Sequence, residues 1–364
     1  MRIYYPADPS PPLKRAFWLP KTLMYLKGYF DYLRIPVWAA YLLTPYFSFV
    51  RCLAIENAPL LKQQHSDGGL PHSLGVVFFS HGLCGMRTAY SQLCSALTAR
   101  GFVVVALEHA DGTACVTSRD NEIIPYLRLD PNDDMDNLRK IRNNQVKTRS
   151  CEVLAAFQLL QSINEGSYCP SENKRGAEIG AFDLGSFKGR LDLKNAVIYG
   201  HSFGGATVIQ VCTDYPDLFR AAIALDPWMF PLQLTEPKLI TIPVLSIQSE
   251  TFHSDENFQH LVELLHHPQA SKKDRFGVVL ETRHSDVSDI MSLLHNTLKK
   301  FDQCGTLHPK TVMSIYDQWV TDFIKGCLDT PASRILPSFP DFSAQKSQGV
   351  LFEYEALEFL KKEH

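Results

Sequence analysis

A serine flanked by glycines lies between two apolar segments, and it restricts the fold more than any other feature of the sequence. The segment is Gly200-His201-Ser202-Phe203-Gly204, with AVIY immediately before it and GATVIQ after it. The first run has the composition of a buried strand, and the second that of a helix. Glycines on both sides of the serine allow a tight turn with closely approaching backbone. The segment therefore predicts a strand, a sharp turn and a helix, with the serine at the turn.

Further strands and helices are expected on both sides of this turn. Short β-branched runs predict strands, and apolar residues at helical spacing predict helices. The expected strands cover residues 75–80, 102–107, 196–199, 221–225, 242–248 and 277–281, and the expected helices cover 88–99, 205–212 and about 20 residues around 146–160. Strands separated by helices need crossover connections. We therefore predict an α/β fold with a mainly parallel central sheet and helices on both faces.

The other segments are expected to decorate a single domain. The length of 364 residues suits one large α/β unit with insertions. We expect a core at about 70–300, an N-terminal decoration at 1–69, a solvated insertion at 110–143, a polar connection at 164–191, and a linker followed by a helix of about 351–363 within 328–364.

Composition excludes several classes of protein. A hydrophobic fraction of 45% is too high for a disordered chain, and 36 basic against 39 acidic residues give no sign of a nucleic-acid partner. The nine cysteines form no C-x-x-C pair, no N-x-S/T sequon is present, and the first residues lack the apolar region of a signal peptide. The sequence as it stands indicates a cytoplasmic or peripheral membrane protein.

A serine held on such a turn is the nucleophile elbow of the α/β-hydrolase fold. A serine nucleophile needs a base to accept its proton and an acid to orient that base, and in this fold the chain order is Ser, then Asp or Glu, then His. Asp226 ends the first strand after the turn, Glu250 ends the next strand, and Asp255 follows. Spacing alone leaves Asp226 and Glu250 equally suitable.

The favoured base is His284, which follows the last expected strand and precedes a helix beginning near Val287. This is the usual place of the catalytic histidine in the fold. Four other histidines are rivals: His253, His266, His267 and His295. The adjacent His266 and His267 before Pro268 indicate a solvated helix end, and His295 lies inside an expected helix.

Acyl transfer also needs donors aimed at the developing oxyanion. The backbone N–H groups of Phe203 and of Leu83, in the segment SHGLCG, are expected to supply them. His81, His109 and His201 lie near these segments, and we interpret all three as structural histidines satisfied by backbone hydrogen bonds. The sequence contains neither H-E-x-x-H nor a zinc-like Cys/His spacing, so neither a metal nor a cofactor is expected.

An aromatic-rich segment at residues 17–49 is not explained by the fold pattern. Its most apolar part, Ile35 to Val50, is bounded by Arg34 and Arg51 and contains two prolines. Sixteen residues broken by proline are too few to span a bilayer. The segment predicts either an interfacial membrane element or a packed cap on the domain.

Several longer stretches resemble one family, the serine-dependent platelet-activating factor acetylhydrolases, also called lipoprotein-associated phospholipase A2. The matching stretches are RIYYP at 2–6, VVFFSHGLCGMRTAYS at 76–91, GFVVVALEHADGTA at 101–114, IRNNQVKTR at 141–149, YGHSFGGATVIQ at 199–210 and ALDPWMFPL at 224–232. They extend in order over most of residues 1–300. The family normally has sequence before the R-x-Y-Y-P stretch, so secretion is the alternative compartment if a leader is missing.

The resemblance implies residue roles and an activity. The nucleophile of the family falls on Ser202, its acid on Asp226 and its base on His284, within a His-x-x-x-x-Asp pattern ending at Asp289. The oxyanion donors fall on Leu83 and Phe203. The implied enzyme is a calcium-independent esterase that removes short or oxidised sn-2 acyl chains from phospholipids. A broader carboxylesterase or acyl-lipase, and a catalytically silent lipid-binding homologue, are the alternatives.

The resemblance also implies contact with a membrane or lipoprotein surface. Members of the family bind such surfaces through an apolar helix in the N-terminal region and another after the histidine. Here the corresponding residues are Trp38, Leu42, Leu43, Met291, Leu293 and Leu294. The chain departs from the family pattern at Cys84-Gly85-Met86 and at Pro227, and the match becomes fragmentary after about residue 300.

Overall fold

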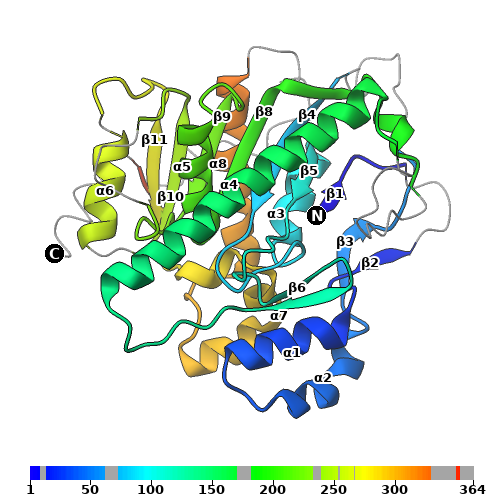
Figure 1. Cartoon of the computed structure of the whole chain (residues 1–364), viewed down its shortest axis with the longest axis vertical. Helices are drawn as coiled ribbons and strands as arrows, with labels where there is room; N and C mark the ends of the chain where they lie inside the picture. Colours follow the sequence, from blue (N-terminus) through cyan, green and yellow to red (C-terminus); the bar gives the residue numbers. More distant parts are fainter. Residues whose placement is uncertain are drawn as a thin grey trace.

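An eight-stranded sheet forms the centre of the computed structural model, with strand order β1-β5-β4-β8-β9-β10-β11-β12 (Figure 1). The structure describes residues 1–8, 14–61, 73–169, 182–232, 239–252, 255–265, 267–328 and 350–352. The strands are β1 (Arg2–Tyr4), β5 (Val103–Ala106), β4 (Leu74–Ser80), β8 (Leu191–His201), β9 (Ala221–Leu225), β10 (Val244–Ser249), β11 (Arg275–Val279) and β12 (Val350–Phe352). The six inner strands are parallel, and β1 and β12 pair antiparallel at the two edges. The prediction of a mainly parallel sheet is confirmed.

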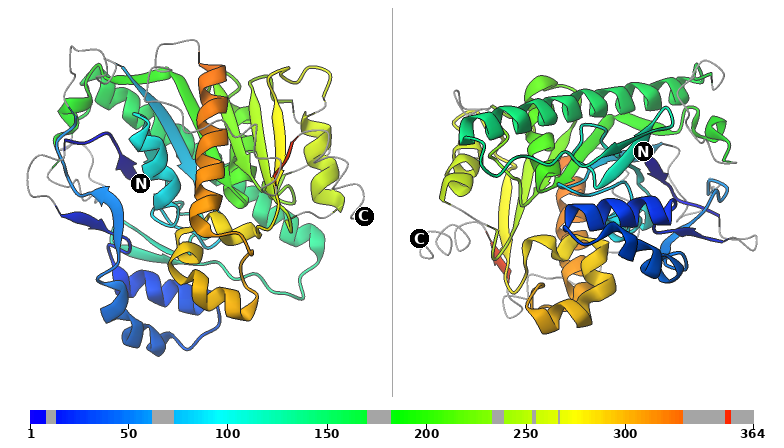
Figure 2. Two further views of the ribbon diagram at one scale, coloured as in Figure 1. Left: turned by 180° about the vertical axis from the view of Figure 1, so that it is seen from behind. Right: turned by 60° about the horizontal axis from the view of Figure 1, so that its bottom comes forward.

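Helices cover both faces of the sheet. One face carries α4 (Met135–Glu165), α5 (Phe203–Asp214) and α6 (Asp255–Leu265), in front in Figure 1. The other face carries α3 (Ser91–Ala99) and α8 (Pro309–Cys327), which the reverse view in Figure 2 brings forward. A hydrophobic core lies on each face of the sheet, and alternate side chains of β4 point into one or the other. Val76 and Phe78 pack with α4 and α5, while Val77 and Phe79 pack with α3 and α8. The fully buried parallel strands explain the continuous apolar runs of the sequence.

Residues 110–143 are only in part the solvated insertion that their charges predicted, since 118–141 are exposed or half-buried. Residues 113–117 are buried, a hairpin follows in β6 (Val116–Arg119) and β7 (Glu122–Pro125), and α4 already begins at Met135. The 31-residue helix is capped by the Asp134 side chain, which accepts a hydrogen bond from Asn137 N at 2.7 Å. The prediction was wrong for the two ends of the segment, because residues 112–117 are buried and α4 buries Arg142 and Asn143. Polar composition concealed this buried helix face.

The C-terminal region also differs from the expectation. The predicted helix at about 351–363 is wrong at its start, because Val350–Phe352 form β12 and pair with Gly277–Val279 of β11. The remainder of that helix and the linker at 329–349 lie outside the described residues. The apolar face of α8, which the sequence analysis did not assign, packs against the sheet through Val312, Ile315 and Ile324.

The aromatic-rich N-terminal segment folds into α1 (Thr22–Tyr32), a short 3-10 turn η1 (Val37–Ala39) and α2 (Ala40–Phe47), joined to the sheet by β2 (Arg15–Phe17) and β3 (Arg51–Ile55). Its aromatic residues divide into two groups. Trp18, Tyr25, Phe30 and Phe47 are buried in the core. Exposed side chains cover the opposite side: Val37, Trp38, Tyr41, Leu42, Leu43, Tyr46 and Phe49. Among the described helices, none combines the length and the apolar character needed to cross a bilayer.

Two short 3-10 turns and one helix complete the carboxyl-terminal half. They are η4 (His284–Val287), α7 (Asp289–Leu298) and η5 (Lys299–Phe301), and a further turn, η3 (Leu184–Phe187), precedes β8. Helices α1, α2 and α7 lie at the same end of the molecule (Figures 1 and 2). A hydrogen bond from Trp18 Nε1 to Asp289 Oδ2 at 3.0 Å connects the segment before α1 to the start of α7.

Candidate active site

Ser202 stands in the turn between β8 and α5, as the sequence predicted. Its backbone has φ 59° and ψ −118°, a conformation that is strained for a residue other than glycine. The turn requires glycine on both sides. A Cβ on Gly204 would lie 2.0 Å from the Ser80 carbonyl oxygen, and a Cβ on Gly200 would lie 2.2 Å from the Gly204 oxygen. Close backbone packing therefore holds the serine out at the carboxyl edge of the sheet.

His284 lies between Ser202 and Asp226. Its Nε2 is 2.9 Å from Ser202 Oγ, and its Nδ1 is 3.0 Å from Asp226 Oδ2. A carboxylate can only accept, so Nδ1 carries the proton and Nε2 is free to accept one from the serine hydroxyl. Asp226 is buried and also accepts from Ser249 N at 2.7 Å and from Ser249 Oγ at 2.6 Å. The Asp226 carboxylate, which accepts from His284, is thus also held by two hydrogen bonds from Ser249.

The rival residues lie elsewhere. Glu250, the alternative acid, accepts a hydrogen bond from Glu281 N. His295 on α7 contacts Cys304 Sγ at 3.5 Å, and His267 accepts from Gln269 N at 3.2 Å. His253 and His266, together with the side chain of Asp255, lie outside the described residues.

Two rings sandwich the His284 imidazole. The Phe252 ring stacks on one face with centroids 3.7 Å apart, and the His201 ring lies on the other face at 4.5 Å. His201 Nδ1 is 2.8 Å from the Tyr90 hydroxyl, while His201 Nε2 is buried without a hydrogen-bond partner among the described atoms. Burial lowers the pKa of His201 well below the usual value, so the ring facing His284 is neutral.

The prediction that the structural histidines are satisfied by backbone groups is right for one of three. His81 Nδ1 donates to the Gly82 carbonyl at 2.8 Å. His109 instead bonds to side chains, with Nε2 2.8 Å from Ser80 Oγ and Nδ1 2.6 Å from Glu152 Oε2. His201 also pairs with a side chain, the Tyr90 hydroxyl. The prediction was wrong for His109 and His201 because their partners are side chains 29 to 111 residues away in the sequence, which the local pattern does not identify.

The loop after β4 faces the elbow. Its turn is closed by Gly85 N donating to the Gly82 oxygen at 3.0 Å and by Cys84 N donating to the Thr113 oxygen at 2.7 Å, with Cys84 at φ 58°. Within the described ranges, the N–H groups of Leu83 and Phe203 donate to no other protein atom. Two unpaired amides beside a serine hydroxyl can donate hydrogen bonds to a developing oxyanion and so stabilise it.

Several residues of the site were not found from the sequence: Tyr90, Arg149, Ser249 and Phe252. Tyr90 and Arg149 do lie within the stretches that carry the family resemblance, but nothing in their local pattern indicates a role. Ser249 and Phe252 lie within two residues of Glu250, and no motif distinguishes them from their neighbours. Their relation to His284 depends on the parallel pairing of β10 with β11, which is a tertiary property.

One group of residues in the described part of the chain also has the spacing of metal ligands. Ligand atoms of His201, Asp226 and His284 lie within 4.8 Å of one another. However, both ring nitrogens of His284 are already engaged, one by Asp226 and the other by Ser202. The arrangement therefore suits a proton relay better than a metal centre.

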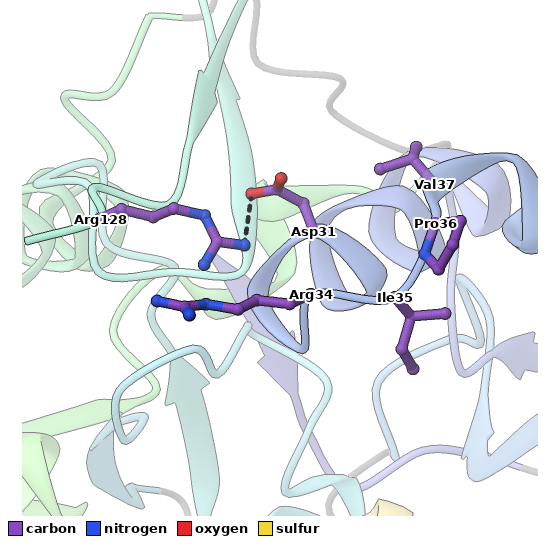
Figure 3. Close-up of a pocket in the computed structure, with 6 residues that line it drawn as sticks. All are labelled: Asp31, Arg34, Ile35, Pro36, Val37 and Arg128. Carbon is purple, nitrogen blue, oxygen red and sulfur yellow. Dashed lines mark ion pairs between the residues drawn. The ribbon is translucent and has the colours of Figure 1, made fainter.

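A hollow lies at the end of α1, and Ser202 is not among the residues that line it. It is lined by Asp31, Arg34, Ile35, Pro36, Val37 and Arg128, and Figure 3 shows the two guanidinium groups on the same side of it. Arg128 pairs with Asp31 at 3.3 Å. Ile35 and Val37 continue into the exposed apolar surface of η1 and α2, so this hollow places charged groups at the border of that surface.

Comparison with solved structures supports the fold. A ferulic acid esterase from Streptomyces cinnamoneus superposes with a TM-score of 0.62 at 20% identity, covering 96% of this chain and 87% of that one. At this identity the likeness concerns architecture. Together with the strand–turn–helix at Ser202, it identifies the α/β-hydrolase fold.

Comparison with known sequences is more specific. The chain is 33% identical over 271 residues to platelet-activating factor acetylhydrolase of Canis lupus familiaris, covering 72% of this chain and 57% of that protein. It is 32% identical over 284 residues to the enzyme of the same name from Cavia porcellus, covering 75% and 60% respectively. A putative phospholipase A2 of Schizosaccharomyces pombe is 30% identical over 293 residues, covering 72% and 64%. The chain thus spans less than two thirds of the length of these relatives.

The family profile described as platelet-activating factor acetylhydrolase, isoform II, matches residues 1–332, which include the elbow, Asp226, His284 and the aromatic-rich segment. The match thus covers most of the 364 residues. The chain belongs to the platelet-activating factor acetylhydrolase, isoform II, family.

Proposed function

We propose that the protein is a calcium-independent serine esterase that hydrolyses the short or oxidised sn-2 acyl ester of phospholipids resembling platelet-activating factor. The observation that carries this proposal is the placement of His284 within hydrogen-bond distance of both Ser202 Oγ and Asp226 Oδ2. Membership of the family supports the choice of ester and of phospholipid.

The first half of the reaction forms an acyl-enzyme. Ser202 Oγ attacks the sn-2 carbonyl carbon while its proton passes to His284 Nε2. The carbonyl oxygen becomes an oxyanion, which accepts hydrogen bonds from Leu83 N–H and Phe203 N–H. When the tetrahedral intermediate collapses, the glycerol oxygen leaves and takes the proton from His284 Nε2. The products of this half are the lysophospholipid and an acyl ester on Ser202.

The second half reverses the roles. Water attacks the acyl carbon and gives its proton to His284 Nε2, and collapse of the second intermediate returns that proton to Ser202 Oγ as the carboxylic acid leaves. Asp226 holds the imidazole with Nδ1 protonated throughout and stabilises the imidazolium that forms twice per cycle. The two hydrogen bonds from Ser249 fix Asp226 in that role.

We further propose that the enzyme reaches its substrate by peripheral contact with a membrane or lipoprotein surface. The exposed side chains of Trp38, Leu42 and Leu43 lie at the same end of the molecule as α7, where Leu293 is exposed and Met291 and Leu294 are half-buried. Trp and Tyr beside basic residues suit the headgroup region of a bilayer. Arg34 and Arg128 at the border of this surface would face the lipid phosphates (Figure 3).

The decisive experiment is substitution of Ser202 by Ala in the full chain. Hydrolysis of a short-acyl phosphatidylcholine should fall by about 10⁴-fold, and labelling by a fluorophosphonate should be lost. Ser285→Ala, in the turn that carries His284, serves as the control and should retain both properties. Normal hydrolysis by Ser202→Ala would refute the proposal.

A substrate panel separates the proposal from its alternatives. Acetyl, long-acyl and non-phospholipid esters are compared at equal concentration. A preference for short acyl groups on phospholipid supports the proposed activity, and equal turnover of simple esters indicates a broad carboxylesterase. Failure of Ser202 to label would indicate a catalytically silent lipid-binding homologue.

A further inference from the structure

Arg149, on α4, is fully buried beneath the junction of the elbow and the loop after β4. We propose that Arg149 is a positioning residue that holds the two oxyanion donors, Leu83 N–H and Phe203 N–H, in register with each other. This inference rests on the proposed esterase activity. It concerns a residue that touches neither the nucleophile nor its base.

The guanidinium fixes the loop after β4 from two sides. Arg149 Nη1 donates to the His81 carbonyl oxygen at 2.6 Å, two residues before Leu83. Arg149 Nε and Nη2 donate to Thr113 Oγ1 at 3.0 and 2.5 Å. The carbonyl of the same Thr113 accepts from Cys84 N, one residue after Leu83. The Leu83 amide is therefore held between two anchored peptide groups.

The same side chain contacts the elbow. The Arg149 guanidinium carbon lies 4.5 Å from the centroid of the Phe203 ring, a cation–π distance. Phe203 is fully buried, so its ring and its backbone amide move together. The elbow and the loop also touch directly, because a Cβ on Gly204 would lie 2.9 Å from the His81 oxygen that Arg149 binds. One planar group thus connects both donor segments.

A buried arginine needs a counter-charge, and Asp111 provides it. Arg149 Nε is 3.1 Å from Asp111 Oδ2, and the two side chains are 0% and 1% exposed. Asp111 also accepts from Thr113 Oγ1. A purely structural ion pair would require nothing beyond Asp111. The hydrogen bond to the His81 carbonyl and the contact with Phe203 are the features that point to positioning.

The test has to separate lost geometry from lost folding. Arg149→Met alone would leave Asp111 as an unpaired buried carboxylate, so the test variant combines it with Asp111→Asn. The wild-type chain is the reference, because Asp111→Asn alone would leave Arg149 as an unpaired buried cation. Arg100→Met combined with Asp317→Asn is the control, since Arg100 pairs with Asp317 at 2.7 Å between the end of α3 and α8, with the two side chains 8% and 15% exposed. Thermal unfolding measures the stability of each variant.

Positioning predicts a selective loss of transition-state binding. With a soluble acetyl ester, kcat of the double variant should fall by roughly 30- to 300-fold relative to the wild-type chain, with KM changed by less than about threefold. Affinity for a trifluoromethyl ketone, which forms an oxyanion on Ser202, should fall in parallel. Affinity for an ether analogue without the carbonyl should stay constant. Arg149→Lys should recover part of kcat, because it keeps a donor and a charge but not the planar group.

The outcomes are distinguishable. The inference is overturned if the folded double variant keeps the wild-type kcat, if both inhibitors lose affinity equally, or if the control double variant at Arg100 and Asp317 lowers kcat to the same extent. Those results leave the esterase proposal intact as long as Ser202→Ala is inactive. Absence of ester hydrolysis by the wild-type chain would overturn both.

Discussion

The Phe252 ring lies nearly flat against the His284 imidazole, with centroids 3.7 Å apart and an angle of 17° between the planes. Phe252 follows β10 and His284 follows β11, so the contact joins two neighbouring strand ends of the sheet. It covers one face of the ring that is proposed to become charged during the reaction, and His201 covers the other. Orientation of the base therefore depends on aromatic packing as well as on Asp226.

Replacing Phe252 with Leu should lower kcat for a soluble ester by roughly three- to tenfold, because the stacked aromatic face stabilises both the ring orientation and the transient imidazolium. Steady-state kinetics with a soluble acetyl ester checks this. Phe258→Leu, which disturbs an aromatic pair with Phe276 away from the serine, is the control. Equal activity of the two variants would show that the stacking has no kinetic role.

The choice of acid can be tested by a direct comparison of two carboxylates. Asp226→Asn should reduce kcat by about 10³- to 10⁴-fold, because the amide no longer holds the imidazole in the required tautomer. Glu250→Gln should change kcat by less than about threefold, since Glu250 bonds to the Glu281 amide and not to His284. Severe impairment by Glu250→Gln, with an active Asp226→Asn, would reverse the assignment.

Substitution by alanine should change the free energy of unfolding in opposite directions at Gly204 and Gly326. A Cβ on Gly204 would lie 2.0 Å from the Ser80 oxygen, so Gly204→Ala should lower the free energy of unfolding by about 3 kcal/mol or more. Gly326, within α8, has no atom within 4 Å of an added Cβ, and Gly326→Ala should raise it by roughly 0.5–1 kcal/mol. Urea denaturation of both variants gives the comparison, and a stable Gly204→Ala would contradict the packing described for the elbow.

Asp289 should give stability an unusual dependence on pH. Burial raises the pKa of Asp289 to about 6, against the hydrogen bonds from Ser91, Gln92 and Trp18 that lower it. Because the folded state holds the proton more tightly than the unfolded state, the contribution of this group to stability is complete below pH 4. It falls by about 3 kcal/mol as the pH rises to 6 and beyond. Urea unfolding at pH 4.5 to 7 should show this decline relative to Asp289→Asn, and equal pH slopes would contradict it.

If the proposed membrane contact is correct, substitutions on its surface should weaken liposome binding without changing hydrolysis of a soluble ester. Trp38 and Leu42 are 65% and 70% exposed. Burial of each side chain in a bilayer would contribute roughly 1.5–3 kcal/mol to the free energy of binding. Trp38→Ser combined with Leu42→Ser should weaken liposome binding at least tenfold and leave hydrolysis of a soluble ester unchanged. A parallel loss of soluble-ester hydrolysis would instead assign the segment to the packed core.

The sequence predicted those parts of the fold that local pattern determines. Strands such as Ala221–Leu225 were placed at their observed bounds because buried parallel strands are uniformly apolar. The elbow was recognisable because glycines are required at Gly200 and Gly204. The start of α4 was missed because its buried face contains Arg142 and Asn143, which pair with the Gln145 side chain and the Pro231 carbonyl.

The candidate site was predictable only in part for a related reason. Spacing could not choose between Asp226 and Glu250, since both end strands next to the elbow. The structure separates them, because Asp226 Oδ2 lies 3.0 Å from His284 Nδ1 whereas Glu250 accepts a hydrogen bond from Glu281 N. The catalytic roles of Ser202, Asp226 and His284 stay predictions, but their side chains are within hydrogen-bond distance of one another. Contacts from Tyr90, Arg149 and Phe252 depend on long-range packing that no local pattern encodes.

Because Trp18 is bonded to Asp289 and Trp38 is exposed, these two of the four tryptophans can serve as fluorescent probes of different parts of the protein. The Trp18 indole is 2% exposed and bonded to a carboxylate that lies five residues after His284, whereas the Trp38 indole is 65% exposed on η1. Emission from Trp38 should be quenched by brominated lipid when the protein binds a vesicle, and emission from Trp18 should resist quenching and change with the protonation of Asp289. Variants that retain only Trp18 or only Trp38 of the four tryptophans would therefore report the state of Asp289 and attachment to lipid as separate signals.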